Sequence, residues 1–206
     1  MNDRDRLVEY AIELQSLAQA GLYYGKDVYD RERYERIREI AAGLLGMKSE
    51  LSPEKIKSLF CADYGYQTPK IDTRAAIFHD GKILLVQESD RRWALPGGWC
   101  EVTLSPVEST VKEAREEAGR EIAVRSVIAV QNRDAHNPPP YVYGVVKIFY
   151  LCEELGGAFR ENIETLGTGY FAEDELPPLA VEKCNEEQIR MCFQAYHAEH
   201  WVTRFD

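Results

Sequence analysis

Apolar residues recur at helical spacing through the first third of the chain. The residues between 7 and 18 repeat apolar side chains every three or four positions, and those between 34 and 45 do the same. We expect Asp30 to cap the second of these helices at its N-terminus, and Ser52 followed by Pro53 to start a third. The pattern therefore predicts a small all-helical domain that ends near residue 62.

The spacing changes after residue 69 to the alternation that is typical of strands. The stretch YGYQTPK breaks the helical pattern, so we interpret residues 63–69 as a linker. Five strand-like stretches follow: KIDTRAAIF, KILLVQE, EIAVRSVIAVQN, YGVVKIFYLCEE and LGTGYFA. Asp80 and Gly81 predict a hairpin between the first two. We expect no regular structure in RDAHNPPP, between the third and the fourth, because of its three prolines.

Two helices are predicted among these strands. Ser105 and Glu108 form a capping-box pattern at the start of the first, and Gly119 supplies a left-handed cap at its end. The second is predicted from residue 185 to about residue 200. This mixture of strands and helices predicts an α/β or α+β sandwich over residues 70–206, behind the helical domain of residues 1–62.

Composition and charge narrow the cellular setting. The net charge of −10 argues against a protein built to bind nucleic acid or an anionic membrane, since both reward Lys and Arg. The five cysteines are scattered and form no CxxC pair, so we expect reduced thiols. No apolar run of signal-peptide or membrane-span length is found. We therefore predict a cytoplasmic protein with no membrane partner.

Three glutamates lie close together near the end of the first predicted sandwich helix. Glu113, Glu116 and Glu117 are related by steps of three and four, so they occupy an arc of roughly 100°. They repel one another and sit where the helix dipole disfavours negative charge. A hard divalent cation, Mg²⁺ or Mn²⁺, would offset this because it prefers carboxylate oxygens. The alternative is a solvated acidic face with Lys112 and Arg115 as its partners.

The stretch WALPGGWCEVTLSPVESTVKEAREEAG resembles the signature box of the Nudix hydrolases. That box reads G, five residues, E, seven residues and R-E-U-x-E-E-x-G-U, in which U is apolar. Placing Gly119 on its last glycine puts Gly98 on its first, and Glu113, Glu116 and Glu117 on its three metal-binding glutamates. The resemblance covers most of the predicted sandwich. It implies a Nudix-type α/β/α fold and a metal site formed by these three glutamates.

The stretch also departs from the box at three positions. Leu104 stands where the box has its first Glu, Lys112 where it has Arg, and Arg120 where its last residue is apolar. In the family, that Glu and that Arg help to hold the loop and helix together. Their joint replacement suggests one coupled change, and Glu101 or Glu108 could partly substitute for the missing carboxylate.

The N-terminal helices narrow the resemblance further. GLYYGKDVYDRERYERIREIAAGLL is similar to the N-terminal extension of a bacterial Nudix subgroup that includes CDP-choline pyrophosphatase-like and ADP-ribose pyrophosphatase-like proteins. The resemblance implies metal-dependent hydrolysis of the pyrophosphate bond of a nucleoside diphosphate linked to another moiety, which releases a nucleoside monophosphate. It favours a CDP-choline-like substrate. The alternatives are ADP-ribose and a non-catalytic nucleotide sensor on the same fold.

The candidates for the general base are also glutamates. Glu113, in the box, is the first candidate to take the proton of the attacking water. In some family members a Glu from a later loop is the base instead. Glu161 and Glu164, in RENIETLG, are the candidates of that kind, and each also fits a plain surface carboxylate.

Substrate-binding candidates surround the glycine turn of the box. Arg91 and Arg92 could clamp phosphate oxygens, or they serve loop solubility. Trp93 could stack on a base, and core packing is an equal alternative. Gly97 and Gly98 form a turn at which the backbone can approach a ligand or a metal closely.

The predicted helical domain carries many apolar and aromatic side chains for its size. They are Leu14, Leu17, Leu22, Tyr23, Tyr24, Ile37, Ile40, Leu44 and Leu45. Helices this short do not usually stand alone in water, so these faces must be buried against the sandwich or against a second subunit. We expect a homodimer, because symmetric association is the commonest way to bury leftover apolar surface.

Overall fold

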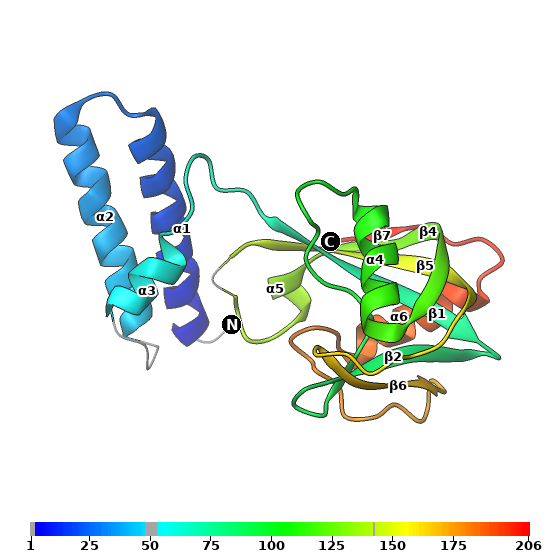
Figure 1. Cartoon of the computed structure of the whole chain (residues 1–206). Coiled ribbons are helices and arrows are strands. Elements are labelled where there is room, and N and C mark those ends of the chain that lie inside the picture. Colours follow the sequence, from blue (N-terminus) through cyan, green and yellow to red (C-terminus); the bar gives the residue numbers. More distant parts are fainter. Residues whose placement is uncertain (1–2, 48–52, 142) are drawn as a thin grey trace. The chain divides into compact units, whose positions relative to one another are not determined.

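The computed structural model describes residues 3–47, 53–141 and 143–206. The chain separates into two compact units, which we describe one at a time (Figure 1). The first comprises Met1–Pro69 with Pro140–Tyr143, and the second comprises Lys70–Pro139 with Gly144–Asp206. The boundaries of domains and linker inferred from the sequence stay predictions. Within the described residues, no helix is long and apolar enough to cross a membrane.

Three helices make up most of the first unit, as predicted. They are α1 (Asp3–Tyr24), α2 (Val28–Gly46) and α3 (Pro53–Phe60). Small and apolar side chains from these helices and from the residue after α3 form one buried cluster: Ala11, Ala41, Ala42, Leu45, Ile56, Phe60 and Cys61.

The start of α2 corrects one prediction. Asp27 has an extended backbone, and its side chain accepts the backbone N–H groups of Tyr29 and Asp30 at 2.9 and 3.0 Å. The N-cap prediction at Asp30 is therefore wrong, because Asp27 already satisfies the free N–H groups of the first turn. Ser52, predicted to start the third helix, lies outside the described residues.

A seven-stranded sheet forms the second unit. Its strands are β1 (Lys70–His79), β2 (Lys82–Glu88), β3 (Trp93–Ala94), β4 (Arg120–Asn132), β5 (Val145–Gly157), β6 (Thr165–Phe171) and β7 (Arg204–Phe205). Six of them follow the order β3-β2-β1-β5-β4-β7, and β6 pairs with β2. The hairpin between β1 and β2 is confirmed, since Asp80 and Gly81 both have positive φ, of 47° and 73°.

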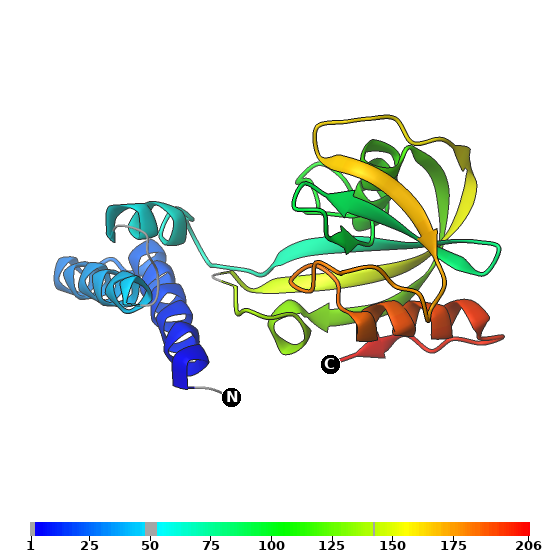
Figure 2. The same cartoon turned by 90° about the horizontal axis from the view of Figure 1, so that it is seen from below.

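Helices cover both faces of this sheet (Figure 2). On one face α4 (Pro106–Ala118) buries Ala114 and Ala118 against side chains of β1, β2, β4 and β5. On the other face α6 (Glu186–His197) buries its own apolar stripe, including Ile189 and Phe193. The predicted α/β/α sandwich is confirmed, because each face of the sheet is apolar and needs a covering helix.

Short elements account for most of the differences from the sequence prediction. A four-residue helix, α5 (Arg133–His136), lies inside RDAHNPPP, where no regular structure was expected. Regular structure is absent, as predicted, from Pro138 to Pro140. The helix before these prolines is capped at its N-terminus by the Asn132 side chain. The two-residue strands β3 and β7 were missed because two residues carry no periodicity.

Candidate active site

The glycine turn lies flat against β1. The backbone N–H of Thr73 donates to the Gly98 carbonyl at 2.9 Å, and that of Ala75 donates to the Pro96 carbonyl at 2.8 Å. Gly97, between them, has a φ of 143°. A β-carbon on Gly97 would stand 1.9 Å from the Thr73 carbonyl oxygen. Only glycine fits this position. The chain continues from this turn to the start of α4 at Pro106.

Gly97 also holds the most buried glutamate of α4. Its backbone N–H donates to Glu117 Oε2 at 2.8 Å. Glu117 is 7% exposed, and this burial raises the pKa of its carboxyl group to about 7. The hydrogen bond from Gly97 and the charge of Arg74 act in the opposite direction, whereas the charges of Glu113 and Glu88 raise the pKa further. An ionised Glu117 is thus under-compensated by the groups around it.

Three carboxylates converge at this point. One oxygen each from Glu113, Glu117 and Glu164 lies within 4.8 Å of the other two. Burial raises the pKa of Glu113 as well, and the charge of Glu164 adds to that rise. Glu164 is exposed, whereas Glu117 is buried and Glu113 is half-buried. We call these three residues the carboxylate cluster.

The loop before β6 brings Glu164 to α4. The Asn162 side-chain oxygen accepts the backbone N–H groups of Glu164 and Thr165, at 3.0 and 2.8 Å. Its amide nitrogen donates to the Glu116 carbonyl at 3.2 Å. The Thr165 hydroxyl donates to the Glu117 carbonyl at 2.8 Å. Sequence reasoning missed Asn162 and Thr165, although an Asn two residues before Glu164 is a recognisable turn signal.

The chemistry of the carboxylate cluster suits a hard divalent cation. All three donors are carboxylates, which Mg²⁺ and Mn²⁺ prefer. Burial is the main cause of the raised pKa of Glu117, and the charge of Arg74 offsets it only in part. A divalent cation would supply further positive charge, so the residues fit the metal that the sequence suggested.

Comparison with known protein families gives a match for each of the two parts of the chain. A family model described as "NUDIX domain" matches residues 69–192, which is more than half of the chain. The chain belongs to the Nudix hydrolase family. A second model, described as "UDP-X-like, N-terminal oligomerisation domain", matches residues 5–60. The Nudix family and the N-terminal extension that the sequence suggested are both confirmed, and the protein is a Nudix pyrophosphohydrolase.

Several known proteins resemble this Nudix hydrolase. "Putative ADP-ribose pyrophosphatase YjhB" of Bacillus subtilis (strain 168) is 41% identical over 200 residues, which cover 97% of this chain and 96% of that protein. The crystal structure of an ADP-ribose pyrophosphatase from Streptococcus suis 89-1591 is 50% identical, with a TM-score of 0.64, and covers 68% of this chain and 100% of its own. A UDP-X diphosphatase crystal structure is 33% identical, with a TM-score of 0.64, over 98% of this chain and 99% of its own.

The departures from the Nudix box have a structural counterpart. Lys112, in place of the usual Arg, pairs with Glu101 at 2.9 Å and with Glu116 at 2.6 Å. Glu101 thus supplies a carboxylate to this position from outside the usual place in the box. Glu108 is used elsewhere, since it completes the capping box with Ser105. Because Glu116 faces Lys112 and lies outside the carboxylate cluster, its role as a metal ligand stays a prediction.

Of the two arginines before the glycine turn, Arg92 already forms ion pairs with other residues. The Arg92 guanidinium forms a bidentate pair with Glu182, and its Nε donates to Asp90 at 2.8 Å. Arg91 is exposed, with a φ of 69°. A phosphate clamp by these residues stays a prediction, and for Arg92 it requires the pair with Glu182 to open.

Trp93 is also engaged within the Nudix fold. Its ring meets the ring of Phe171 edge-on, with a centroid distance of 4.9 Å, and it packs on the core beneath α6. This is the core-packing arrangement that the sequence left open as the alternative. Base stacking by Trp93 stays a prediction.

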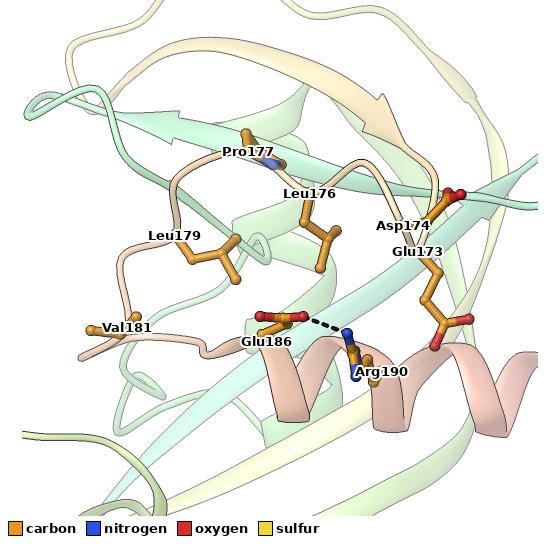
Figure 3. Close-up of a pocket in the computed structure, with 8 residues that line it drawn as sticks. All are labelled: Glu173, Asp174, Leu176, Pro177, Leu179, Val181, Glu186 and Arg190. Carbon is orange, nitrogen blue, oxygen red and sulfur yellow. Dashed lines mark hydrogen bonds and ion pairs between the residues drawn. The ribbon is translucent and has the colours of Figure 1, made fainter.

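A cavity of about 320 Å³ opens between the segment after β6 and the start of α6 (Figure 3). It is lined by Glu173, Asp174, Leu176, Pro177, Leu179, Val181, Glu186 and Arg190. Arg190 is paired with Glu186 across one turn of α6, at 2.6 Å. None of the lining residues belongs to the carboxylate cluster, so we do not place the reaction in this cavity.

Proposed function

We propose that this Nudix hydrolase cleaves the pyrophosphate bond of a nucleoside diphosphate linked to another moiety, with Mg²⁺ or Mn²⁺ as cofactor. The products are a nucleoside monophosphate and the phosphorylated remainder of the substrate. The observation that supports this most directly is the convergence of Glu113, Glu117 and Glu164 within 4.8 Å. Hard carboxylate donors at this density suit a cation that also binds phosphate oxygens.

Each residue of the site has a proposed role. Glu113 and Glu117 hold the metal, and Glu116 joins them if its pair with Lys112 opens. The Gly97 N–H fixes the orientation of the Glu117 carboxylate through their hydrogen bond. When bound, the metal neutralises phosphate oxygens and lowers the pKa of a bound water.

The general base is Glu164 or Glu113. Glu164 is the exposed member of the carboxylate cluster, so a water molecule from solvent can reach it. Glu113 is half-buried, and burial raises the pKa of its carboxyl group toward neutral pH. A base whose pKa lies closer to the working pH is more effective. We favour Glu164, because Glu113 is then free to serve as a metal ligand alone.

The substrate class is a nucleoside diphosphate derivative. The names of the similar proteins make ADP-ribose and UDP-linked compounds the first candidate substrates. CDP-choline is a further candidate, which the sequence suggested. We propose in addition that the enzyme is a homodimer joined through its N-terminal helices. Several large side chains of α1 and α2 are exposed in this chain: Tyr10, Leu17, Tyr23, Tyr24 and Ile40.

A substrate panel tests the proposal. The purified full chain is incubated with ADP-ribose, UDP-glucose and CDP-choline, with Mg²⁺, with Mn²⁺ or with excess EDTA. We expect a nucleoside monophosphate from at least one compound, and none with EDTA. Hydrolysis in ¹⁸O-labelled water, followed by mass spectrometry, identifies which phosphorus is attacked.

Matched variants complete the test. Glu117→Gln should abolish turnover, and the exposed Glu187→Gln, outside the carboxylate cluster, should leave it unchanged. A larger loss of kcat for Glu164→Gln than for Glu113→Gln, at saturating Mg²⁺, would support Glu164 as the base. Tight nucleotide binding without turnover of any compound would contradict the proposed enzyme activity and indicate a nucleotide sensor.

A further inference from the structure

Lys183 lies just before α6 and contacts Glu88, the last residue of β2. Its ammonium group pairs with Glu88 Oε1 at 2.6 Å. The Glu88 side chain is 15% exposed and that of Lys183 is 40% exposed. Glu88 therefore sits deeper, and Lys183 covers it on the solvent side. Neither residue belongs to the Nudix box.

Two relationships place Glu88, the partner of Lys183, near the carboxylate cluster. In the pairing of β2 with β6, Glu88 lies opposite Thr165, the neighbour of Glu164 along the chain. The charge of Glu88 also reaches Glu117 on α4. Glu88 thus stands next to residues from both elements that supply the carboxylate cluster.

The backbone of Lys183 is fixed on both sides. Its N–H donates to the Ala180 carbonyl at 2.8 Å, and its own carbonyl accepts a hydrogen bond from the buried ammonium group of Lys147. The preceding residue, Glu182, is held by Arg92. The backbone of Lys183 is therefore fixed, and its side chain is held by Glu88.

Four of the neighbouring cations are less available to a substrate. Arg74 and Lys147 are 4% and 2% exposed. Lys112 already faces two carboxylates, and Arg92 faces Glu182 and Asp90. Lys183 faces Glu88, and an ammonium group carries three donors. It can therefore keep this partner and still donate to an incoming anion.

We infer that Lys183, held by Glu88 near the carboxylate cluster, binds an oxygen of the diphosphate group of the substrate. This inference rests on the proposed function for the identity of that substrate. A diphosphate bound by metal on one side leaves charged oxygens on the other, and lysine serves such oxygens as a point charge. Glu88 sets where the ammonium group stands and limits its motion.

Binding of methylenediphosphonate, a diphosphate analogue that cannot be hydrolysed, tests the inference without turnover. Titration calorimetry in Mg²⁺ compares the full-length wild type with Lys183→Met, Lys183→Arg and the double variant Lys183→Met/Glu88→Gln. The double variant removes the ammonium group without leaving Glu88 unpaired. Lys82→Met, at the opposite end of β2, is the matched control for loss of one lysine.

We expect Lys183→Met and the double variant to weaken binding about tenfold or more, and Lys183→Arg to recover most of the loss. Lys82→Met should bind as the wild type does. Recovery of binding in the double variant would overturn the inference, since Lys183 would then only neutralise Glu88. Wild-type affinity in Lys183→Met, or no binding by the wild type, would also overturn it.

Kinetics separate this inference from the proposed function. On a substrate that the wild type hydrolyses, Lys183→Met should raise KM by a similar factor, and Lys183→Arg should restore it. If no compound of the panel is hydrolysed but diphosphonate binding depends on Lys183, the proposed function fails and the inference holds. If hydrolysis proceeds with unchanged KM in Lys183→Met, the inference fails and the function holds.

Discussion

The hydroxyl of Thr165 donates a 2.8 Å hydrogen bond to the backbone carbonyl of Glu117. This bond joins the start of β6 to the last turn of α4, where helix carbonyls have no partner within the helix. It therefore sets the position of Glu164, one residue earlier, relative to Glu117. The geometry of the carboxylate cluster depends on this contact between distant parts of the chain.

Thr165→Val should disturb the site more than the fold. The change removes a buried hydrogen bond at nearly constant volume, which costs about 1–2 kcal/mol in the free energy of unfolding. We expect kcat/KM to fall about tenfold, because Glu164 loses its fixed position. Thr168→Val, on the same strand, is the control. A loss of stability with unchanged kcat/KM would mean that the hydroxyl serves only the fold.

Glu117→Gln should abolish hydrolysis and stabilise the metal-free protein at high pH. The pKa of Glu117 is about 7 in the folded protein, against an ordinary value of 4.5. Ionisation in the folded state is therefore unfavourable. Its cost is absent below pH 4.5, grows between pH 4.5 and 7, and is complete above pH 7. Neutral Gln does not carry this cost.

The measurement is urea unfolding of both proteins in EDTA at several pH values. At pH 8 we expect the free energy of unfolding of the variant to exceed that of the wild type by roughly 2 kcal/mol, and the difference to vanish below pH 4.5. Saturating Mg²⁺ should stabilise the wild type far more than the variant. A variant that is less stable at every pH would show that the carboxylate is needed for folding.

Glu101 should prove to be the working replacement for the missing carboxylate of the box. Its pair with Lys112 links the loop before α4 to the helix itself. We expect Glu101→Gln to lower kcat/KM, and the added change Leu104→Glu to restore it by returning a carboxylate to the usual position. Glu108→Gln, which keeps an acceptor for the capping box, is the control. Strict additivity of the two changes would show that positions 101 and 104 do not communicate.

The N-terminal helices should carry the dimer contact. Leu17 is 60% exposed on α1, and we expect Leu17→Glu to shift the protein from dimer to monomer in sedimentation velocity experiments. Val202→Glu, at an 83% exposed position of the second unit, should leave the dimer intact. Removal of residues 1–62 should cause aggregation or loss of substrate selectivity. A truncated chain that is soluble, monomeric and kinetically unchanged would contradict the dimer.

Much of the Nudix unit could be predicted because its signals are local. The caps of α4 at Ser105 and Gly119 act within one helical turn, and the Asp80-Gly81 hairpin acts within two residues. The spacing of Glu113 and Glu117 on one helix already places both carboxylates on one face. At the start of α2 such local reasoning failed, because Asp27 caps the helix three residues earlier and Asp30 lies within its first turn.

Only the tertiary structure decided which distant groups meet. Glu164 and Glu161 were both candidates in the sequence, with Glu164 the one predicted to be catalytic, and the pairing of β6 with β2 brings Glu164 to the carboxylate cluster. The Arg92 guanidinium is held by the carboxylate of Glu182, which is 90 residues away along the chain. Helix caps and turns depend on backbone geometry over a few residues, so a sequence specifies them directly. Contacts across the sheet depend on strand order and register, which the packing of the whole unit determines.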